Sequence, residues 1–126
     1  MAKTGELAFM LMNLRDQIKV YHWQTITYSR HIATNDLLTK LDANIDQFIE
    51  VYIGRYGRPT FSGKTSRIHL MNIGDSDAPA ILTDAIRWMT ERLPGYLKKT
   101  DTDLLNIRDT IVGDLNQVLY LFSFTK

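Results

Sequence analysis

Residues 22–59 read HWQTITYSRHIATNDLLTKLDANIDQFIEVYIGRYGRP, from His22 to Pro59. Within this stretch apolar residues recur at helical spacing, after a polar break at residues 25–29. The apolar positions on one helical face are Leu37, Leu38, Leu41, Ile45, Phe48, Ile49 and Tyr52. Gly57 followed by Pro59 is typical of a helix end, with glycine at the cap and proline just beyond it. We therefore expect a long helix over residues 30–56.

Three further helices are expected on either side of this one. Leucine and isoleucine at alternating spacings of four and three predict a helix over about residues 5–24, with Thr4 as its N-cap. A third helix should begin after Asp77 and should kink or end at Pro94. Asp101 can cap a fourth. The chain therefore reads as all-α.

The connection between the second and third helices is long and rich in turn residues. It spans residues 60–77 and contains a short apolar run from Ile68 to Ile73, which we expect to form one helical turn. No repeat or domain boundary interrupts the chain. We therefore predict one domain over residues 1–126, a four-helix bundle of two antiparallel hairpins joined by this long crossover.

Composition excludes several classes of protein. Fifteen basic against fourteen acidic residues give a net charge of +1 without a lysine-rich arm, so DNA binding is not expected. No apolar run is long enough to span a membrane, and no signal peptide is visible. The absence of cysteine excludes disulfides, thiolate metal sites and iron–sulfur clusters. We expect a cytoplasmic protein whose metal ligands, if any, are oxygen and nitrogen atoms.

Two histidines and two carboxylates are candidate metal ligands: His22, His31, Asp46 and Glu50. Imidazole and carboxylate groups suit iron, manganese or zinc. His31 and Asp46 are 15 residues apart, which corresponds to about 22 Å along one helix. No single ion can contact both within one chain. If they share a metal ion, the site must form between two chains.

A two-fold contact between two copies of the 30–56 helix satisfies this requirement. If the helices cross antiparallel with the axis near residues 38–41, His31 of one copy faces Asp46 and Glu50 of the other. His22, just before the turn that joins the first two helices, is the natural neighbour of His31. Such a contact generates two equivalent sites in a homo-oligomer.

These residues resemble the motif of the miniferritins, the Dps-type ferritin-like proteins. The matching elements are, in order, His22-Trp23, His31, Asp46-Gln-Phe-Ile-Glu50 and Gly57-Arg-Pro59. The resemblance implies a ferroxidase-type site for Fe²⁺ between two-fold-related subunits. It also implies that the bundle with its long crossover is ferritin-like, and that twelve subunits form a hollow shell that stores or detoxifies iron. Zinc or manganese stays open as the metal, and so does peroxide or oxygen as the oxidant.

The chain also departs from this pattern. The segment between His22 and His31 is shorter than usual, and Asn35 stands where the family has an acidic residue. Asp36 lies one place along and is rotated by about 100°. Asn35, Asp36 and Asp42 are therefore further candidate ligands, of which Asp42 suits a supporting or surface position better. The short length also resembles small ferritin-like sequences of large DNA viruses and phages, which would place the protein in a host cytoplasm or a virion.

An alternative function follows from the same departures. A histidine beside a tryptophan at a helix end is often structural, and a row of carboxylates on a helix is often a solvated face. The chain would then be a non-catalytic helical bundle for assembly or partner binding, with a degraded metal site. Because no Glu-x-x-His pair occurs, a di-iron site held within one bundle is not encoded.

Overall fold

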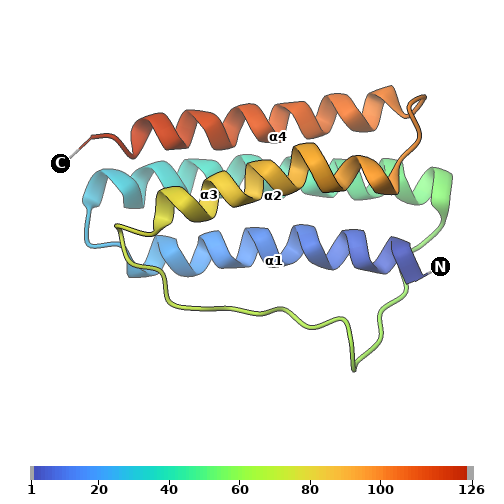
Figure 1. Ribbon diagram of the computed structural model, residues 1–126, viewed down its shortest axis with the longest axis horizontal. Helices are drawn as coiled ribbons and strands as arrows, with labels where there is room; N and C mark the ends of the chain where they lie inside the picture. Colours follow the sequence, from blue (N-terminus) through green and yellow to red (C-terminus); the bar gives the residue numbers. More distant parts are fainter. Residues whose placement is uncertain (1, 125–126) are drawn as a thin grey trace.

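The computed structural model describes residues 2–124, with side chains described from Gly5 onward. All regular elements in this range are helical, which confirms the all-α class (Figure 1). The α-helices are α1 (Ala2–Gln24), α2 (Tyr28–Tyr56), α3 (Ala78–Arg87) and α4 (Thr102–Leu121). A π-helical turn, η1 (Trp88–Arg92), and a 3-10 turn, η2 (Leu93–Tyr96), continue α3.

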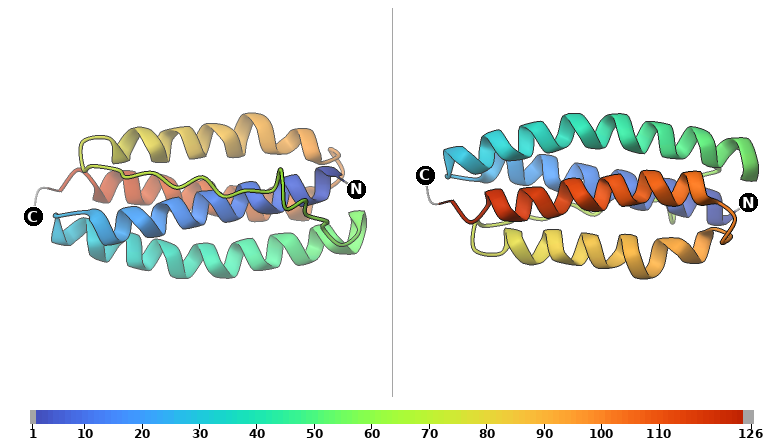
Figure 2. Two further views of the ribbon diagram at one scale, coloured as in Figure 1. Left: turned by 90° about the horizontal axis from the view of Figure 1, so that it is seen from below. Right: turned by 90° about the horizontal axis from the view of Figure 1, so that it is seen from above.

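The four α-helices run along the long axis of the molecule, and α2 packs chiefly on α1 and α4 (Figures 1 and 2). Their apolar faces meet in one core. Its fully buried side chains are Leu7, Leu11, Leu37, Leu41, Phe48, Met89, Leu93, Leu104, Ile111 and Leu115. The outer face of α2 is left to polar side chains, which places the candidate ligands at the surface.

The expected helix boundaries hold within a few residues. α2 begins after Thr27, whose backbone is extended, and it ends at Gly57, which has a φ of 95° and donates its N–H to the Ile53 carbonyl. α4 begins after Asp101 as predicted, but the Asp101 carboxylate binds other groups and does not cap the helix. Thr4 lies inside α1, which already begins at Ala2.

Pro94 explains the irregular end of the third helix. Proline has no N–H, so it cannot bond to the carbonyl one helical turn before it. Leu93 still donates its N–H to the Trp88 carbonyl in a π-type bond, but Pro94 has no N–H to donate to the next carbonyl, that of Met89. The Arg108 guanidinium of α4 donates to this carbonyl at 3.1 Å and satisfies it.

The predicted helical turn at residues 68–73 is wrong. This segment belongs to the α2–α3 connection, residues 57–77, named the strap here, which runs lengthwise along the outside of α1 (Figures 1 and 2). Side-chain amides of α1 accept alternate backbone N–H groups of the strap: Asn13 from His69 at 2.7 Å, Gln17 from Met71 at 2.9 Å and Gln24 from Ile73 at 3.0 Å. Because these amides satisfy the strap's backbone, it stays extended and forms no helix.

The strap also approaches α1 closely near its start. A Cβ atom on Gly5 would lie only 1.8 Å from the Thr60 carbonyl oxygen, so only glycine fits at this position. This contact fixes where the strap leaves the end of α2 and turns back along α1.

Candidate metal site

His22 and His31 come together at the turn between α1 and α2. Their rings stack with centroids 4.0 Å apart and an interplanar angle of 15°. His22 is buried, with 6% of its surface exposed, whereas His31 is exposed. The pair therefore presents one open side to solvent, or to another molecule.

Hydrogen bonds assign the protonated nitrogen of each ring. The Thr34 hydroxyl donates to the Arg30 or His31 carbonyl, at 2.8 or 3.1 Å, so it accepts from Nδ1 of His22 at 2.9 Å. Nδ1 of His31 lies 3.0 Å from the His22 carbonyl oxygen, which can only accept. Both rings therefore carry their proton on Nδ1 and keep the lone pair of Nε2. Metal-binding histidines are typically held in this way.

The protonation state of His22 favours the same chemistry. Burial lowers the pKa of His22, and the nearby His31 and Lys19 lower it further. The imidazole therefore stays neutral near pH 7, and its Nε2 lone pair is free to bind a cation.

A carboxylate from the strap fixes the turn that carries the two rings. Asp75 accepts hydrogen bonds from Tyr21 at 2.6 Å, Thr25 at 2.6 Å and Thr27 at 2.9 Å. Burial alone would raise the pKa of Asp75, but these hydroxyl groups outweigh burial and lower it. Because residues 25–27 form the turn between the histidines, Asp75 holds the ends of α1 and α2 in place.

Arg30 completes this anchor on the side of α4. Its guanidinium donates to the Tyr21 hydroxyl, to the Asp75 carbonyl and, at 3.1 Å, to the Phe122 carbonyl. It also lies 4.6 Å from the centroid of the Phe122 ring, a cation–π distance. The histidine end of the molecule is therefore tied to two other segments of the chain, the strap and the end of α4.

Asp46 and Glu50 lie on the same helix as His31 but far from it, by about 22 and 28 Å along the axis. Both are exposed, and neither has a hydrogen-bond or ion-pair partner among residues 2–124. Within the described part of the chain no three His, Cys, Asp or Glu side chains form a group that could hold a metal ion. The structure brings together His22 and His31 but not the carboxylates.

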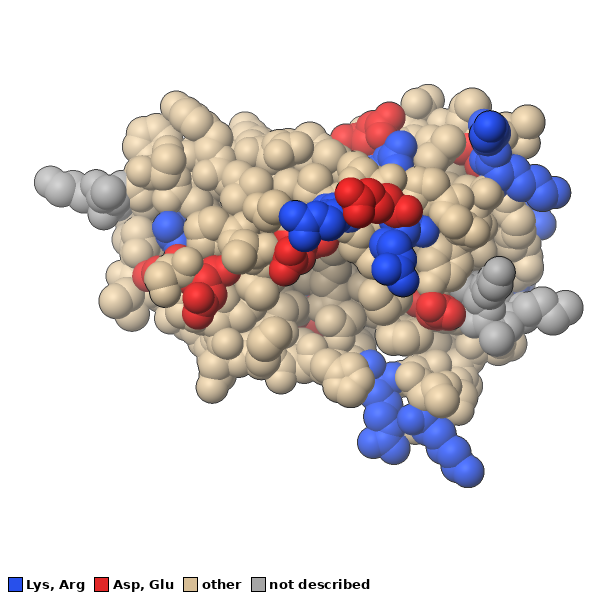
Figure 3. Space-filling model, in the orientation of Figure 1, with Lys and Arg blue, Asp and Glu red and all other residues tan. Residues whose placement is uncertain are grey.

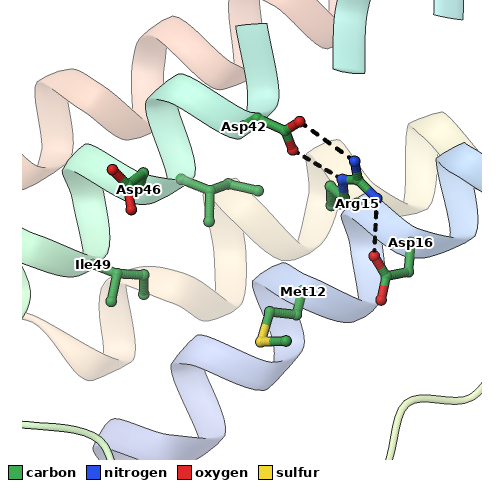
Figure 4. A pocket seen from close by; sticks show the side chains of 7 residues that line it. Met12, Arg15, Asp16, Asp42, Asp46 and Ile49 are labelled. Atoms are coloured by element: carbon green, nitrogen blue, oxygen red, sulfur yellow. Dashed lines mark hydrogen bonds and ion pairs between the residues drawn. The ribbon is translucent and has the colours of Figure 1, made fainter. Parts of the chain in front are cut away.

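The three further candidate ligands, Asn35, Asp36 and Asp42, differ in whether a partner already binds them. Asp42 receives two bonds from the Arg15 guanidinium, at 2.9 and 3.3 Å, and is committed to that ion pair (Figure 4). Asn35 and Asp36 are exposed, and no side-chain partner is found for either within the described range. Asp42 therefore suits a supporting position better than that of a ligand.

Sequence reasoning missed three residues that shape the site. Thr34, one turn beyond His31, carries the only side chain that is hydrogen-bonded to the buried ring of His22 in the described structure. The sequence indicated this role of Thr34 only weakly, because a single threonine in a helix is common. Arg15 and Asp75 gave no local signal, because their partners lie 27 and about 50 positions away.

The comparisons with known proteins bear on the whole of this region. A model of a family of unknown function, DUF5856, matches residues 22–122. The chain belongs to this family. The DUF5856 match begins at His22 and contains every candidate ligand named above. None of the curated proteins and none of the solved structures compared with the chain matches it.

Two surface properties of this DUF5856 protein bear on its partners. None of the helices in the described residues is long and apolar enough to cross a membrane. On the face seen in Figure 3, acidic and basic side chains are interspersed along the middle of the molecule rather than gathered by sign. Such a mixture gives no support to strong binding of nucleic acid on this face.

Proposed function

We propose that this chain is a ferritin-like protein that resembles the miniferritins, a four-helix bundle with a long crossover that oxidises Fe²⁺ between two copies. One observation carries the proposal. Two stacked imidazoles keep free Nε2 atoms with no carboxylate of their own chain nearby in the described structure, while Asp46 and Glu50 stand unpartnered further along α2. The twelve-subunit shell and the cytoplasmic location implied by the resemblance belong to the same proposal.

A two-fold contact along α2 would complete the site. With the axis near residues 38–41, the exposed side of His31 in one copy faces Asp46 and Glu50 of the other. Two imidazoles and two carboxylates together make a donor set that suits divalent iron. Each dimer would contain two such sites.

The ring geometry suggests how Fe²⁺ would bind as the substrate. A metal ion lies in the plane of the imidazole that binds it, and the planes of His22 and His31 are nearly parallel. A single ion cannot lie in both planes, so the stack favours one ion on each ring. Two Fe²⁺ ions would each give up one electron and become Fe³⁺. With two protons from solvent, these electrons would reduce one hydrogen peroxide molecule to two water molecules. The chain's own residues position the ions and neutralise their charge.

Iron oxidation tests the proposal directly. Adding Fe²⁺ and peroxide to the purified protein should give ferric absorbance, with about two ions oxidised rapidly per site. Glu50→Ala and His31→Ala should lose the rapid phase, whereas Glu91→Ala, an exposed carboxylate on η1, should keep it. Equal rates in wild type and Glu50→Ala would refute the site.

Mixed chains test whether the site is shared. His31→Ala and Glu50→Ala proteins should each be inactive. In their heterodimer, one of the two sites keeps all its ligands and the other loses two. Random mixing at equal concentrations should therefore restore about a quarter of wild-type activity. No recovery in a mixture shown to contain heterodimers would exclude a site between subunits.

The alternative, a non-catalytic assembly or partner-binding protein, has its own support. Asp42 is engaged by Arg15, and Asn35 offers a weaker amide oxygen in place of a carboxylate. Under this alternative the dimer forms but freshly purified protein neither binds nor oxidises Fe²⁺. Titration with Zn²⁺ and Mn²⁺ in the same experiment would separate a site for another metal from no site.

A further inference from the structure

Trp23 is unusually exposed for a side chain of its size. It lies at the end of α1 beside His22, and 68% of its surface is accessible. The Lys19 ammonium lies 5.5 Å from the centroid of its ring and provides the only contact described for it within residues 2–124. An exposed indole of this kind is typical of a side chain that is buried in a complex.

A groove of about 330 Å³ lies further along the same face, between α1 and α2 (Figure 4). Met12, Ile45 and Ile49 form its apolar part, and Asp42 and Asp46 are among the polar residues that border it. Met12 is 47% exposed, so the groove is open to a large apolar side chain.

Contacts between α1 and α2 fix the register of the two helices. Arg15 pairs with Asp42, and His22 pairs with Thr34, so α1 and α2 run antiparallel along this face. Trp23, the residue after His22, therefore lies roughly level with Thr34 of α2.

The two-fold contact proposed above then determines where Trp23 meets the other copy. With the axis near residues 38–41, a side chain level with residue 34 is carried to roughly residues 42–48 of the partner's α2. This is the part of α2 that lines the groove.

We propose that in the homodimer Trp23 of each copy is buried in the groove formed by Met12, Ile45 and Ile49 of the other copy. This contact rests on the two-fold arrangement of the proposed function and identifies the side chain that anchors it. It occurs twice in each dimer, at the two ends of the interface.

The charges of the two regions are complementary. Lys19 carries a positive charge beside the tryptophan ring, whereas Asp46 at the border of the groove and Glu50, one turn further along α2, carry negative charges. The indole N–H is a donor, and Asp46, which has no partner within the described residues, is an acceptor at the border of the groove. The tryptophan of a second copy therefore fits the groove in polarity and charge.

Association of the full chain tests the contact by sedimentation equilibrium in the presence of a chelator. Trp23→Glu and Met12→Lys should each weaken the wild-type dimer by at least about 30-fold. Tyr120→Glu is the matched control, because Tyr120 is an aromatic residue with 64% exposure on α4, away from the α1–α2 groove. It should leave the dimer unchanged.

Mixing the two weakened chains separates loss of the contact from loss of folding. In the heterodimer, the new glutamate of the Trp23→Glu chain meets the new lysine of the Met12→Lys chain, and the second contact is wild type. The mixture should therefore regain a dimer that neither chain forms alone. Failure to regain it, unchanged association of Trp23→Glu, or a monomeric wild-type protein would each overturn the contact.

The peroxide assay on the same samples distinguishes this inference from the proposed function. A dimer that depends on Trp23 but oxidises no iron would retain the contact and refute the function. Rapid iron oxidation by a Trp23→Glu protein that remains dimeric would support the proposed function and refute the Trp23 contact.

Discussion

Two hydrogen-bonded carboxylates hold different loops: Asp75 lies in the strap just before α3, and Asp101 lies just before α4. The two loops are at opposite ends of the molecule (Figure 1). Asp75 binds the hydroxyl groups of Tyr21, Thr25 and Thr27. Asp101 is 4% exposed and precedes α4. Its partners are the Tyr56 hydroxyl, the Lys98 N–H at 2.8 Å and the Arg55 guanidinium at 3.2 Å.

The difference lies in what each carboxylate supports. The partners of Asp75 include the turn between the two stacked histidines, whereas those of Asp101 join the end of α2 to the α3–α4 loop. Both should contribute to the free energy of unfolding. Only Asp75 should also affect metal binding.

The largest effect is expected for Asp75→Ala. It removes the acceptor of three hydroxyl groups and should lower the free energy of unfolding by about 3 kcal/mol. Iron binding should weaken as well, because the turn that positions the rings loses its anchor. Urea denaturation and iron titration measure the two effects. Asp77→Ala, an exposed neighbour, is the control, and iron affinity equal to wild type in Asp75→Ala would contradict the coupling.

Asp101→Ala should lower the free energy of unfolding by about 2 kcal/mol, since it leaves a tyrosine hydroxyl and a backbone N–H without their acceptor. Iron binding should be unchanged. The same two measurements apply, and a loss of iron affinity would show that the two ends are not independent.

Gly5→Ala tests a second contact at the Asp101 end. Alanine normally stabilises a helix relative to glycine, but here its Cβ would overlap the Thr60 carbonyl. The variant should lose about 1.5 kcal/mol. Gly113→Ala on α4, where nothing lies within 4 Å of the added atom, should instead gain up to about 1 kcal/mol. The same sign for both variants, measured by thermal denaturation, would refute the close approach.

Thr34→Val removes the hydroxyl group that binds the His22 ring. The variant leaves Nδ1 of the buried His22 without an acceptor, which should cost about 1 kcal/mol of stability. The effect on metal should be larger, with about tenfold weaker iron binding, because the ring is no longer held in the right tautomer. Thr34→Ser keeps the hydroxyl and should bind iron normally. Equal affinities for the two variants would exclude this role.

The smallest effect concerns acid stability. Hydrogen bonds from Tyr56 and the Lys98 N–H lower the pKa of Asp101, and the pKa of Asp75 is lowered as well. A carboxylate with a lowered folded pKa contributes stability above its unfolded pKa of about 3.9, and the contribution is lost as the pH falls through the folded pKa. The urea concentration at the midpoint of unfolding should therefore decrease as the pH is lowered below about 4. In Asp75→Asn and Asp101→Asn, the urea midpoint should each time decrease less steeply with falling pH. A pH dependence equal to that of the wild type would contradict the role of these two carboxylates.

The helices could be predicted because their signals are local. The apolar spacing of α2, Gly57 at its end and Pro79 in the first turn of α3 all act within a few residues of their own position. The strap could not be predicted in this way. Its extended form depends on amides of α1, such as Gln17, which binds both the N–H and the carbonyl of Met71 from 54 positions away.

In the candidate site, too, the features that depend on local sequence could be predicted and those that depend on distant residues could not. An α1–α2 hairpin is sufficient to predict that His22 lies near His31. Thr34 as the acceptor of the buried ring, and Arg15 as the partner of Asp42, depend on the register between the helices. Spacing along one helix predicts that register only roughly, since small shifts exchange one partner for another.

The tip of the strap has a practical consequence for biochemistry. Its backbone bonds largely to itself, as Ser66 donates to the Ser62 carbonyl at 2.8 Å and Ser62 donates to the Ser66 hydroxyl at 3.1 Å. Between them Gly63 is exposed, with nothing within 4 Å of an added Cβ. An epitope or a fluorophore inserted there should leave helix packing undisturbed, so this loop is a suitable labelling site for following assembly in solution.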